Sequence, residues 1–434
     1  MSRFTSSIKI LNTRNWPSAG KAAVSFGLVG LALAGPLLAD GCNPQPFSRW
    51  LDGVRQEARA QGISGKTLDQ LDGLGYSSKV IAMDRKQGVF AQTFLTFAGR
   101  MANNYRLTHG KKYMREYADL FQRLEAEYGV PAAVITAFWA LETDFGANTG
   151  NFDTLTALAT LAHDCRRPEL FRPQLLAALE ILDRGYLSRE QMKGAWAGEL
   201  GQTQFLPSDY LKHGQDADGD GRIDLLKSKA DVIASTASHL AHLGWRKGEP
   251  WLEEVSVPAQ LDWEQANLET LLPVSTWLQW GVRPIRGKLR GQNLKASLLL
   301  PMGKDGPAFL AYDNFRIYTE WNKSLVYATT AAYLATRLAG AGKVAVGRAE
   351  VASLSLAETK ALQRLLQDKG HDVGKIDGII GAGTRAAVRA EQKRLGLPAD
   401  GYPTQPLLAA LQGDPTAASR ALPPSAGYSA PFIH

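Results

Sequence analysis

Apolar residues recur at helical spacing along most of the first 340 residues of the chain. Helical patterns dominate residues 47–110, and KKYMREYADLFQRLEAEYG (111–129) carries apolar side chains three and four positions apart. This spacing predicts one long amphipathic helix that ends at its glycine. The next segment, PAAVITAFWAL (131–141), predicts a buried helix, because Thr136 is its only polar residue.

The pattern changes twice toward the C-terminus. Trp, Pro and Gly are frequent and the periodicity is poor between residues 250 and 315, so we expect short strands and loops there, followed by a helix that ends at Gly340. Residues 341–352 are typical of a linker, and residues 353–412 of a compact unit. The composition of the tail, residues 413–434, is rich in Pro, Ala and Ser and predicts disorder.

The compact unit contains one pattern twice. Ser355 and Glu358 have capping-box spacing before its first helix. IDGIIGAGTRAAV and ADGYPTQPLLAAL then each contain an Asp-Gly turn that leads to a threonine, Thr384 or Thr404, which we expect to cap a short helix. GAGTRA also has the spacing of a dinucleotide fingerprint, but that motif requires a preceding strand and a βαβ unit, so the turn is favoured.

The formal net charge of +7 is concentrated near the N-terminus. Of the 49 basic residues, four lie in residues 1–39, which contain no acidic residue, so 45 basic residues face 42 acidic ones in the remainder. Such a balance does not supply the concentrated basic face of a nucleic-acid-binding protein. We therefore expect no nucleic-acid partner.

The first 39 residues have the plan of a secretory signal peptide. A basic stretch precedes AAVSFGLVGLALAGPLLA (22–39), and a polar break follows it, which predicts cleavage after residue 39 and export to the periplasm. An uncleaved anchor is the alternative, because the run is just long enough to span a bilayer. A lipoprotein site at Cys42 is disfavoured, because the leucine of LADGC lies one position too far from the cysteine.

Cys42 and Cys165 are the only cysteines. In an exported protein this even count permits a disulfide, which we expect, and two unrelated thiols are the alternative. No CxxC or Cys/His cluster indicates zinc, and neither GxSxG nor HExxH occurs. His239 and His242 lie three positions apart on one helical face, and the absence of a carboxylate placed as in zinc proteases favours a packing or surface role.

The segment DADGDGRIDLLK (216–227) has features of a calcium-binding loop. Positions 1, 3 and 5 are aspartates, position 6 is glycine, and position 9 is also an aspartate. Position 12 should offer a bidentate carboxylate but is Lys227, which leaves an Asx-rich turn as the alternative. The candidate ligands of a structural Ca²⁺ are Asp216, Asp218, Asp220 and Asp224.

Glu142 follows the apolar helix while the helical pattern still runs. Desolvation favours the protonated form of a carboxyl group, and a protonated carboxyl can donate to a glycosidic oxygen. Taken alone, these residues are also compatible with the alternative that Glu142 lies at a solvent-exposed helix end and has no catalytic role. Asp144 points away from Glu142 on a helix, so the two do not form the carboxylate pair of a retaining glycosidase.

Residues 47–340 resemble the membrane-bound lytic murein transglycosylase B family, which has a lysozyme-like fold. The resemblance is carried, in the family's order, by YGVPAAVITAFWALETDFG, LATLAHDCRRPELF, GAWAGELGQTQFLPSDY, DADGDGRIDL and NFRIYTEWNKSLVYA. Residues 353–412 separately resemble the three-helix peptidoglycan-binding domain through LQRLLQDKG, IDGIIGAGT and LPADG. The implied fold is mainly α, with a lysozyme-like catalytic domain at 40–340 and a small three-helix domain at 353–412.

The resemblance also assigns roles to single residues. It places the family's catalytic acid on Glu142. The substrate-binding residues that it implies are Gln204, Arg166, Arg167, Phe97 and Trp321.

The chain departs from the family at several of these positions. Ala195 corresponds to a serine that the family can use beside the acid. Leu170, Arg316 and Trp321 occupy places where tyrosines can occur, so we expect a partly rebuilt sugar-contacting wall. The family also has an EF-hand-like site, whose twelfth loop position is Lys227 in this chain.

The resemblance implies a periplasmic, monomeric lytic murein transglycosylase that requires no cofactor. It would cleave the β-1,4 bond between N-acetylmuramic acid and N-acetylglucosamine and form 1,6-anhydromuramic acid ends, with one carboxyl group acting as acid and then as base. Its partners would be peptidoglycan glycan strands, with other cell-wall enzymes as candidates. The alternatives are a hydrolytic muramidase and a non-catalytic peptidoglycan-binding scaffold, and the intact Glu142 and Gln204 argue against the scaffold.

Overall fold

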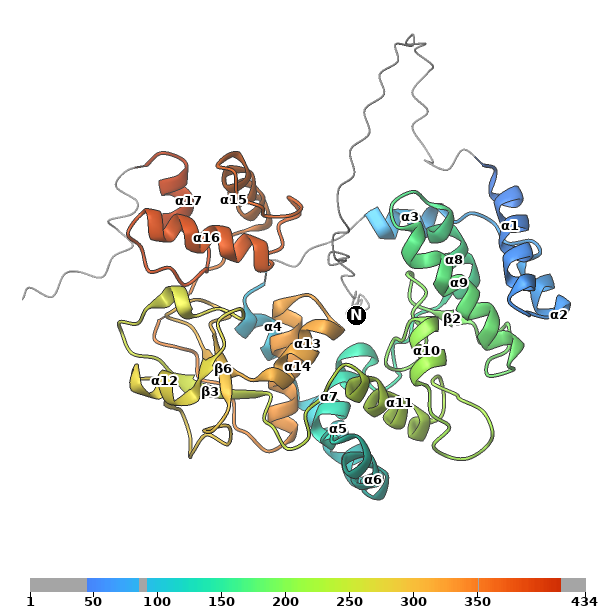
Figure 1. The fold of residues 1–434 in the computed structure, drawn as a ribbon, viewed down its shortest axis with the longest axis horizontal. Coiled ribbons are helices and arrows are strands. Elements are labelled where there is room, and N and C mark those ends of the chain that lie inside the picture. Colours follow the sequence, from blue (N-terminus) through green and yellow to red (C-terminus); the bar gives the residue numbers. More distant parts are fainter. Residues whose placement is uncertain (1–44, 86–91, 350, 415–434) are drawn as a thin grey trace, which may run out of the picture.

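The computed structural model of the chain describes residues 45–85, 92–349 and 351–414. The signal peptide expected at 1–39, Cys42 and all but the first two residues of the expected tail lie outside the described residues. The described part is mainly helical, as predicted (Figure 1). None of its helices is both long and apolar enough to cross a membrane.

The first ten α-helices run from the N-terminal region to the middle of the chain: α1 (Phe47–Ala60), α2 (Gly65–Leu68), α3 (Ser78–Arg85), α4 (Phe94–Met101), α5 (Asn104–Glu116), α6 (Ala118–Tyr128), α7 (Ala132–Thr143), α8 (Thr154–His163), α9 (Pro168–Asp183) and α10 (Pro207–His213). The remaining ones are α11 (Lys229–His242), α12 (Val274–Gln279), α13 (Asp313–Trp321), α14 (Leu325–Leu338), α15 (Leu356–Asp368), α16 (Ala382–Arg394) and α17 (Gln405–Leu411). Short 3₁₀ helices lie at η1 (Asp69–Leu71) and η2 (Trp263–Gln265).

Helix α7 connects two groups of helices. One group contains α1, α3, α8, α9 and α10, and the other contains α4, α13 and α14 (Figure 1). Helix α7 packs against α14 of the second group and against α11, which in turn contacts α10 of the first. A residue at the end of α7 is therefore held from both sides of the molecule.

The single amphipathic helix predicted at 111–129 is wrong in one respect, because the segment forms parts of two helices. Helix α5 ends at Glu116 and α6 begins at Ala118. Tyr117 between them has φ −109° and ψ 28°, outside the α-helical region. The apolar spacing continues through this break, which is why the pattern alone did not reveal it.

Short strands and loops occur between 250 and 315, as expected. The strands β3 (Leu252–Ser256), β4 (Leu272–Pro273), β5 (Arg283–Pro284), β6 (Lys295–Leu299) and β7 (Ala308–Ala311) form an antiparallel sheet in the order β4-β6-β7-β3-β5. A second, two-stranded sheet pairs β1 (Phe152–Asp153) with β2 (Lys193–Gly194).

The five-stranded sheet separates two hydrophobic cores. On β7, Phe309 belongs to the large helical core and Leu310 to a smaller core around Trp277, because successive side chains of a strand point to opposite faces. Every residue of β7 is consequently buried. The sheet thus anchors the α13–α14 pair to the rest of the molecule.

Helices α15, α16 and α17 enclose a third core. The predicted capping box is confirmed, because Ser355 accepts from the Glu358 N–H and Glu358 accepts from the Ser355 N–H. Thr404 caps α17 as predicted. The cap predicted at Thr384 is wrong: α16 starts at Ala382, and Thr384 is buried within it, where its hydroxyl accepts from Gln363.

This third unit is docked on the sheet region. Arg385, only 8% exposed, donates to the carbonyl oxygens of Leu300 (3.2 Å) and Pro301 (2.8 Å). The Lys304 N–H donates to Asp400 at 2.9 Å. The two units therefore share a buried polar interface.

The segment expected as a linker also lies against the sheet region. The Arg348 guanidinium donates to the carbonyl oxygens of Pro258 (2.9 Å) and Lys304 (2.8 Å) and lies over the Trp263 ring. The chain between the two units is thus held at Arg348.

Candidate active site

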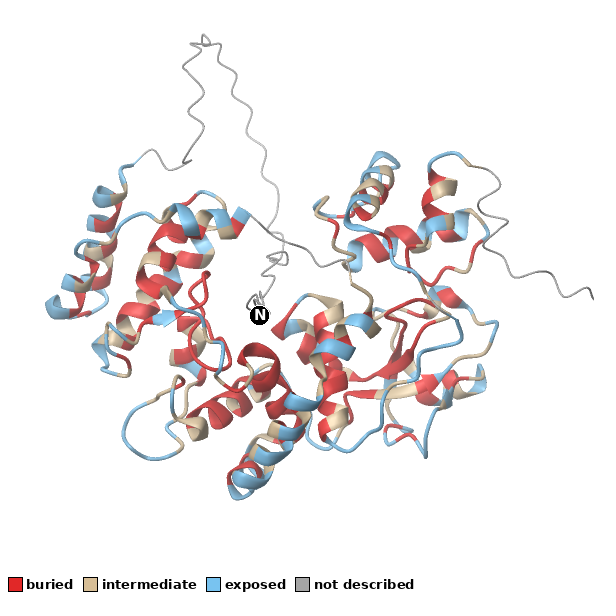
Figure 2. Cartoon of the chain, turned by 180° about the vertical axis from the view of Figure 1, so that it is seen from behind, coloured by how far each residue is buried: buried red, intermediate tan, exposed pale blue. Residues whose placement is uncertain are grey.

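Glu142 lies in the last turn of α7, the most completely buried helix of the site. Every residue from Ala133 to Thr143 is buried, in agreement with the apolar sequence (Figure 2). Glu142 itself is 3% exposed. The alternative of a helix end that opens into solvent is therefore excluded.

Two donors converge on one oxygen of Glu142. The Trp321 Nε1–H donates to Oε1 at 2.7 Å, and the Tyr327 hydroxyl donates to the same oxygen at 2.5 Å. Trp321 ends α13 and Tyr327 lies in the first turn of α14, so the turn between these helices delivers both donors. The shared acceptor fixes the orientation of the carboxyl group through Oε1.

Tyr327 was not identified from the sequence, although it lies in the quoted segment NFRIYTEWNKSLVYA. Burial, and then the charge and hydrogen bond of Glu142, raise the pKa of its hydroxyl well above the ordinary value. The hydroxyl consequently remains a donor at any physiological pH. Ala195, which the resemblance aligns with a serine of the family, has no hydroxyl, and Glu142 has Trp321 and Tyr327 as donors here.

Asp144 is more than a residue at a helix end. Its Oδ1 lies 2.8 Å from the Nε of Arg106, whose side chain is 2% exposed. Burial lowers the pKa of Arg106, and the charge of Asp144 opposes this effect. Arg106 also donates to the carbonyl oxygen of Ala140 in α7, so the pair fixes the end of the helix that carries Glu142.

The loop 194–206 is fastened to the same helix. Gln202 accepts from the Trp139 indole at 2.9 Å, and its carbonyl oxygen accepts from the Thr143 hydroxyl at 2.5 Å. Gln204, two residues on, donates to the carbonyl oxygens of Thr149 (3.2 Å) and Gly201 (2.9 Å). These contacts hold Gln204 next to the segment that follows Glu142.

Positive φ angles occur at three non-glycine residues of the described chain: Asp144 (53°), Phe145 (61°) and Gln204 (53°). Asp144 and Phe145 directly follow α7, and Gln204 lies in the loop 194–206 that is hydrogen-bonded to this helix. Left-handed backbone at non-glycine residues costs roughly 1–3 kcal/mol each and persists where surrounding contacts enforce it. The strain is therefore concentrated around the candidate acid.

Arg166 and Arg167 are held together by one carboxylate. Asp84 of α3 is 1% exposed, pairs with Arg166 at 2.7 Å and also pairs with Arg167. Burial acts to raise the pKa of Asp84, but the hydrogen bonds and charges of the two arginines outweigh it, so the pKa lies below the ordinary value. Both arginines keep part of their side chain exposed, 24% and 17%.

The other residues named from the sequence are distributed around the molecule. Phe97 is half-buried on α4, next to Arg100. Leu170 is half-buried on α9, and Arg316 is exposed on α13, where it pairs with Asp313. Trp321 is 4% exposed, so the structure presents it as a partner of Glu142.

The carboxylates that converge at the predicted calcium loop differ from the four that the sequence suggested. Carboxylate oxygens of Asp216, Asp218 and Asp231 lie within 4.8 Å of one another. Asp220 and Asp224 lie outside this set. Backbone N–H groups donate to both of them, as they also do to Asp216 and Asp231. Three converging carboxylates fit the oxygen ligands of Ca²⁺, and Asp231 supplies the buried one that the loop motif itself lacks.

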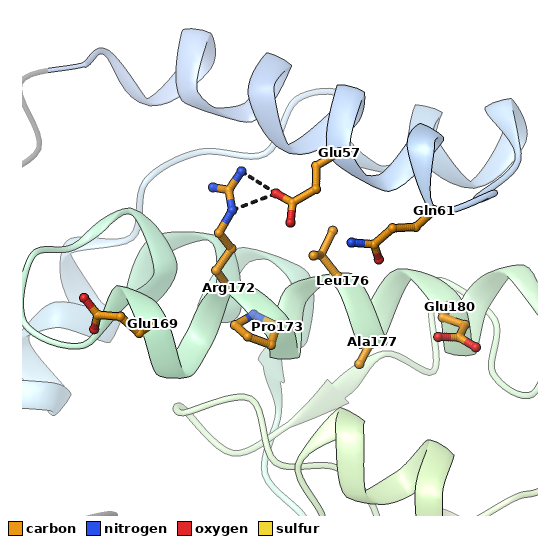
Figure 3. A pocket seen from close by; sticks show the side chains of 8 residues that line it. All are labelled: Glu57, Gln61, Glu169, Arg172, Pro173, Leu176, Ala177 and Glu180. Carbon is orange, nitrogen blue, oxygen red and sulfur yellow. Dashed lines mark hydrogen bonds and ion pairs between the residues drawn. The ribbon is translucent and has the colours of Figure 1, made fainter. Parts of the chain in front are cut away.

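A pocket on the surface between α1 and α9 is separate from this site (Figure 3). Glu57, Glu169 and Glu180 line it together with Arg172, which pairs with Glu57. None of the residues predicted for the active site lies in its lining. Cys165 is exposed just before the arginine pair, and because Cys42 lies outside the described residues, the disulfide stays a prediction.

Comparisons with known proteins agree with this geometry. The family model "Transglycosylase SLT domain" matches residues 46–336, and "Putative peptidoglycan binding domain" matches residues 355–411. "Membrane-bound lytic murein transglycosylase B" of Escherichia coli (strain K12) is 32% identical over 224 residues, 51% of this chain. Those residues span 60% of that relative, less than two thirds of its length.

Two solved structures are similar over most of the described chain. SltB3 from Pseudomonas aeruginosa, in complex with NAG-anhNAM-pentapeptide, is 40% identical with a TM-score of 0.78, covering 85% of this chain and 100% of SltB3. The Escherichia coli lytic transglycosylase Slt35 in complex with calcium is 26% identical with a TM-score of 0.58, covering 68% of this chain and 93% of Slt35. Since the SLT family model alone matches more than half of the sequence, the chain belongs to the transglycosylase SLT domain family.

Proposed function

We propose that the chain is a lytic murein transglycosylase. It cleaves the β-1,4 bond between N-acetylmuramic acid and N-acetylglucosamine and leaves 1,6-anhydromuramic acid ends. The observation that carries the proposal is the buried Glu142, whose Oε1 accepts hydrogen bonds from both Trp321 and Tyr327.

The first step is proton donation. With two donors on Oε1, the acidic proton of Glu142 belongs on Oε2, from which it passes to the glycosidic oxygen as the C1–O bond breaks. The N-acetylglucosamine side leaves with that proton. The muramyl C1 is then electron-poor and requires a nucleophile.

The second step needs no water. The muramyl C6 hydroxyl attacks C1, and its proton returns to the Glu142 carboxylate, which restores the acid. Asp144 is committed to Arg106, so it is not offered as a second carboxylate of the kind that most glycosidases use. The anhydro sugar in the SltB3 complex supports this product for the proposed reaction.

The remaining roles follow the family resemblance. We propose that Gln204, Arg166, Arg167, Phe97 and Trp321 contact the glycan. Trp321 would in addition orient the carboxyl group of Glu142. The strained backbone of Gln204 supports a functional placement of its side chain.

We also propose the division of the chain into a catalytic domain at 40–340, a linker at 341–352 and a peptidoglycan-binding domain at 353–412. The C-terminal unit would hold the enzyme on the sacculus. Its own core and its family match support this role.

Two further proposals concern the environment of the enzyme. We propose export to the periplasm with removal of residues 1–39, and a Cys42–Cys165 disulfide that an oxidising compartment permits. We also propose a structural Ca²⁺ at Asp216, Asp218 and Asp231. The ion would cross-link the loop to the start of α11, and the calcium complex of Slt35 supports it.

The test of the function is the mass of the muropeptides released from purified sacculi. A transglycosylase product is one water lighter than the hydrolytic product, because the C6 hydroxyl replaces water as the nucleophile. Reducing muramic ends would instead identify a hydrolytic muramidase, and no release would leave a binding scaffold.

A further inference from the structure

Three histidines and an aspartate meet where α10 packs against α11. The His213 and His239 rings are stacked with centroids 4.5 Å apart and an interplanar angle of 5°. The His242 ring lies 4.6 Å from His213. Asp209 lies one helical turn before His213 on α10, so the two side chains share a face.

Both stacked histidines are buried, His213 at 4% and His239 at 7% exposure. Asp209 is partly exposed and His242 is exposed, which leaves the cluster an open side toward solvent. One ligand atom from each of Asp209, His213 and His239 lies within 4.8 Å of the others. The sequence showed only the His239 and His242 pair, because Asp209 and His213 join them through helix packing.

We infer that Asp209, His213 and His239 form a binding site for a borderline divalent transition metal ion, of which Zn²⁺ is the representative. Two imidazoles and one carboxylate are ligands that Zn²⁺ takes in proteins. Zn²⁺ bonds of about 2.0–2.1 Å place tetrahedral ligand atoms about 3.3 Å apart. Since an imidazole nitrogen binds a metal in the plane of its ring, one of the two stacked rings would have to turn out of the stack to close this set. A water molecule from the open side completes the coordination.

This site differs in ligand chemistry from the carboxylate cluster at Asp216. Ca²⁺ takes oxygen ligands, whereas imidazole selects Zn²⁺ and its neighbours in the transition series. The inference is also independent of the proposed function, because none of the three ligands takes part in the reaction.

The site adjoins the active site through one ring contact. His239 lies 5.2 Å from the Trp321 ring, and Trp321 donates to Glu142. A metal ion on His239 would fix the ring against which Trp321 packs. Its expected effect is on the stability of this region.

The experiment uses the full chain without a histidine tag, titrated with Co²⁺ as a spectroscopic probe and then with Zn²⁺. We expect one Co²⁺ with visible absorption bands, displaced by one Zn²⁺ and unaffected by excess Ca²⁺. The melting temperature should rise with Zn²⁺. Absence of stoichiometric binding, or displacement by Ca²⁺, would overturn the inference.

Substitutions assign the ligands. His213→Gln and His239→Gln should each weaken Co²⁺ binding at least tenfold, while His109→Gln on α5 should leave it unchanged as the matched control. Because both stacked histidines are buried, circular dichroism must first establish folding. If either fails to fold, Asp209→Asn decides, since its partly exposed side chain can be replaced at little structural cost. Unchanged affinity in Asp209→Asn would refute the site.

Discussion

At the scale of single residues, the proposed reaction depends on the carboxyl group of Glu142. Glu142→Gln should abolish turnover of purified sacculi, because an amide of nearly the same shape cannot donate and then recover a proton. General acid–base groups supply about 10²–10⁴-fold, and a group used in both steps belongs at the upper end. Glycan binding should persist, since the amide oxygen can still accept from Trp321 and Tyr327. Turnover near the wild-type rate would assign the proton to another group.

The matched control for this substitution is Asp144→Asn, two residues on. It removes the charge that faces the buried Arg106, so its expected cost is in stability. Turnover of the folded variant should fall far less than that of Glu142→Gln.

Tyr327 offers a second prediction at this scale. Tyr327→Phe removes one of the two donors to Oε1, and loss of a donor makes the ionised carboxylate less favourable. The limb of the rate profile that falls with rising pH should therefore shift to higher pH, with a lower kcat. Tyr318→Phe is the control, because Tyr318 is fully buried nearby and packs on Phe138. Equal pH profiles for the two variants would exclude a role for the Tyr327 hydroxyl in tuning the acid.

The local pattern, an apolar helix that ends on an acid, draws attention to Glu142, and the family resemblance assigns it the role of catalytic acid. Its hydrogen-bond partners could not be found in this way. Trp321 and Tyr327 lie 179 and 185 residues away along the chain, and only the packing of α13 and α14 beside α7 brings them to the carboxyl group. The pairing of Arg106 with Asp144 also joins two separate helices, α5 and the end of α7.

At the scale of elements, periodicity predicts which segments are helical but not where backbone geometry breaks them. The apolar pattern runs through Tyr117, whose dihedral angles separate α5 from α6. Thr384 has the local features of a cap, but α16 begins two residues earlier, and its hydroxyl bonds with Gln363 of α15 instead. In both cases, contacts between elements determine where the helix ends or begins.

Asp84 connects two elements, since it joins α3 to the α8–α9 turn through Arg166 and Arg167. Asp84→Asn should lower the free energy of unfolding at pH 7 by about 2–4 kcal/mol, because it leaves two partly buried cations without their carboxylate. The pKa of Asp84 is lowered in the folded state, so its contribution is present above the unfolded value of about 3.9 and is lost as the pH falls through the folded pKa.

Denaturant titrations of wild type and Asp84→Asn at several pH values measure this difference. The difference in free energy of unfolding between them should be largest at neutral pH and should shrink as the pH falls below about 4. Asp52→Asn, at an exposed aspartate of α1, is the control and should show no gap. A gap that is independent of pH would mean that the charge of Asp84 is not what stabilises the turn.

The loop 216–231 provides a further prediction at the element scale. If Ca²⁺ binds Asp216, Asp218 and Asp231, it should stabilise the fold by about 2.7 kcal/mol at a concentration one hundred times its Kd. Thermal melts with calcium and with chelator measure this. Asp231→Asn should remove the response, whereas Asp224→Asn should retain it, because Asp224 lies outside the set of converging carboxylates. Identical melts of the wild-type chain in calcium and chelator would leave the turn without an ion.

At the scale of the whole molecule, the C-terminal unit has its own hydrophobic core and is also docked on the sheet region. Its core closes around Leu362, Val388 and Leu407 without residues of the catalytic region. Tyr402, in contrast, belongs to the large helical core. A tethered module would raise the local concentration of the enzyme on the sacculus whatever its orientation. A docked one would also fix the direction in which a bound strand meets Glu142.

Arg385 is the residue on which this docking can be tested. Burial lowers its pKa to about 10, so the guanidinium stays charged at neutral pH while it donates to Leu300 and Pro301. Arg385→Ala removes hydrogen bonds to a charged group, which are worth about 1.5–3 kcal/mol. Calorimetry should then show two separated unfolding transitions, because the third core can persist after the interface opens. Turnover of short soluble glycans should remain at the wild-type level while turnover of sacculi falls.

Arg364→Ala, on the exposed face of α15, should resemble wild type in both assays. Should Arg385→Ala match Arg364→Ala in calorimetry and on sacculi, the C-terminal unit would act as a tether whose orientation does not matter.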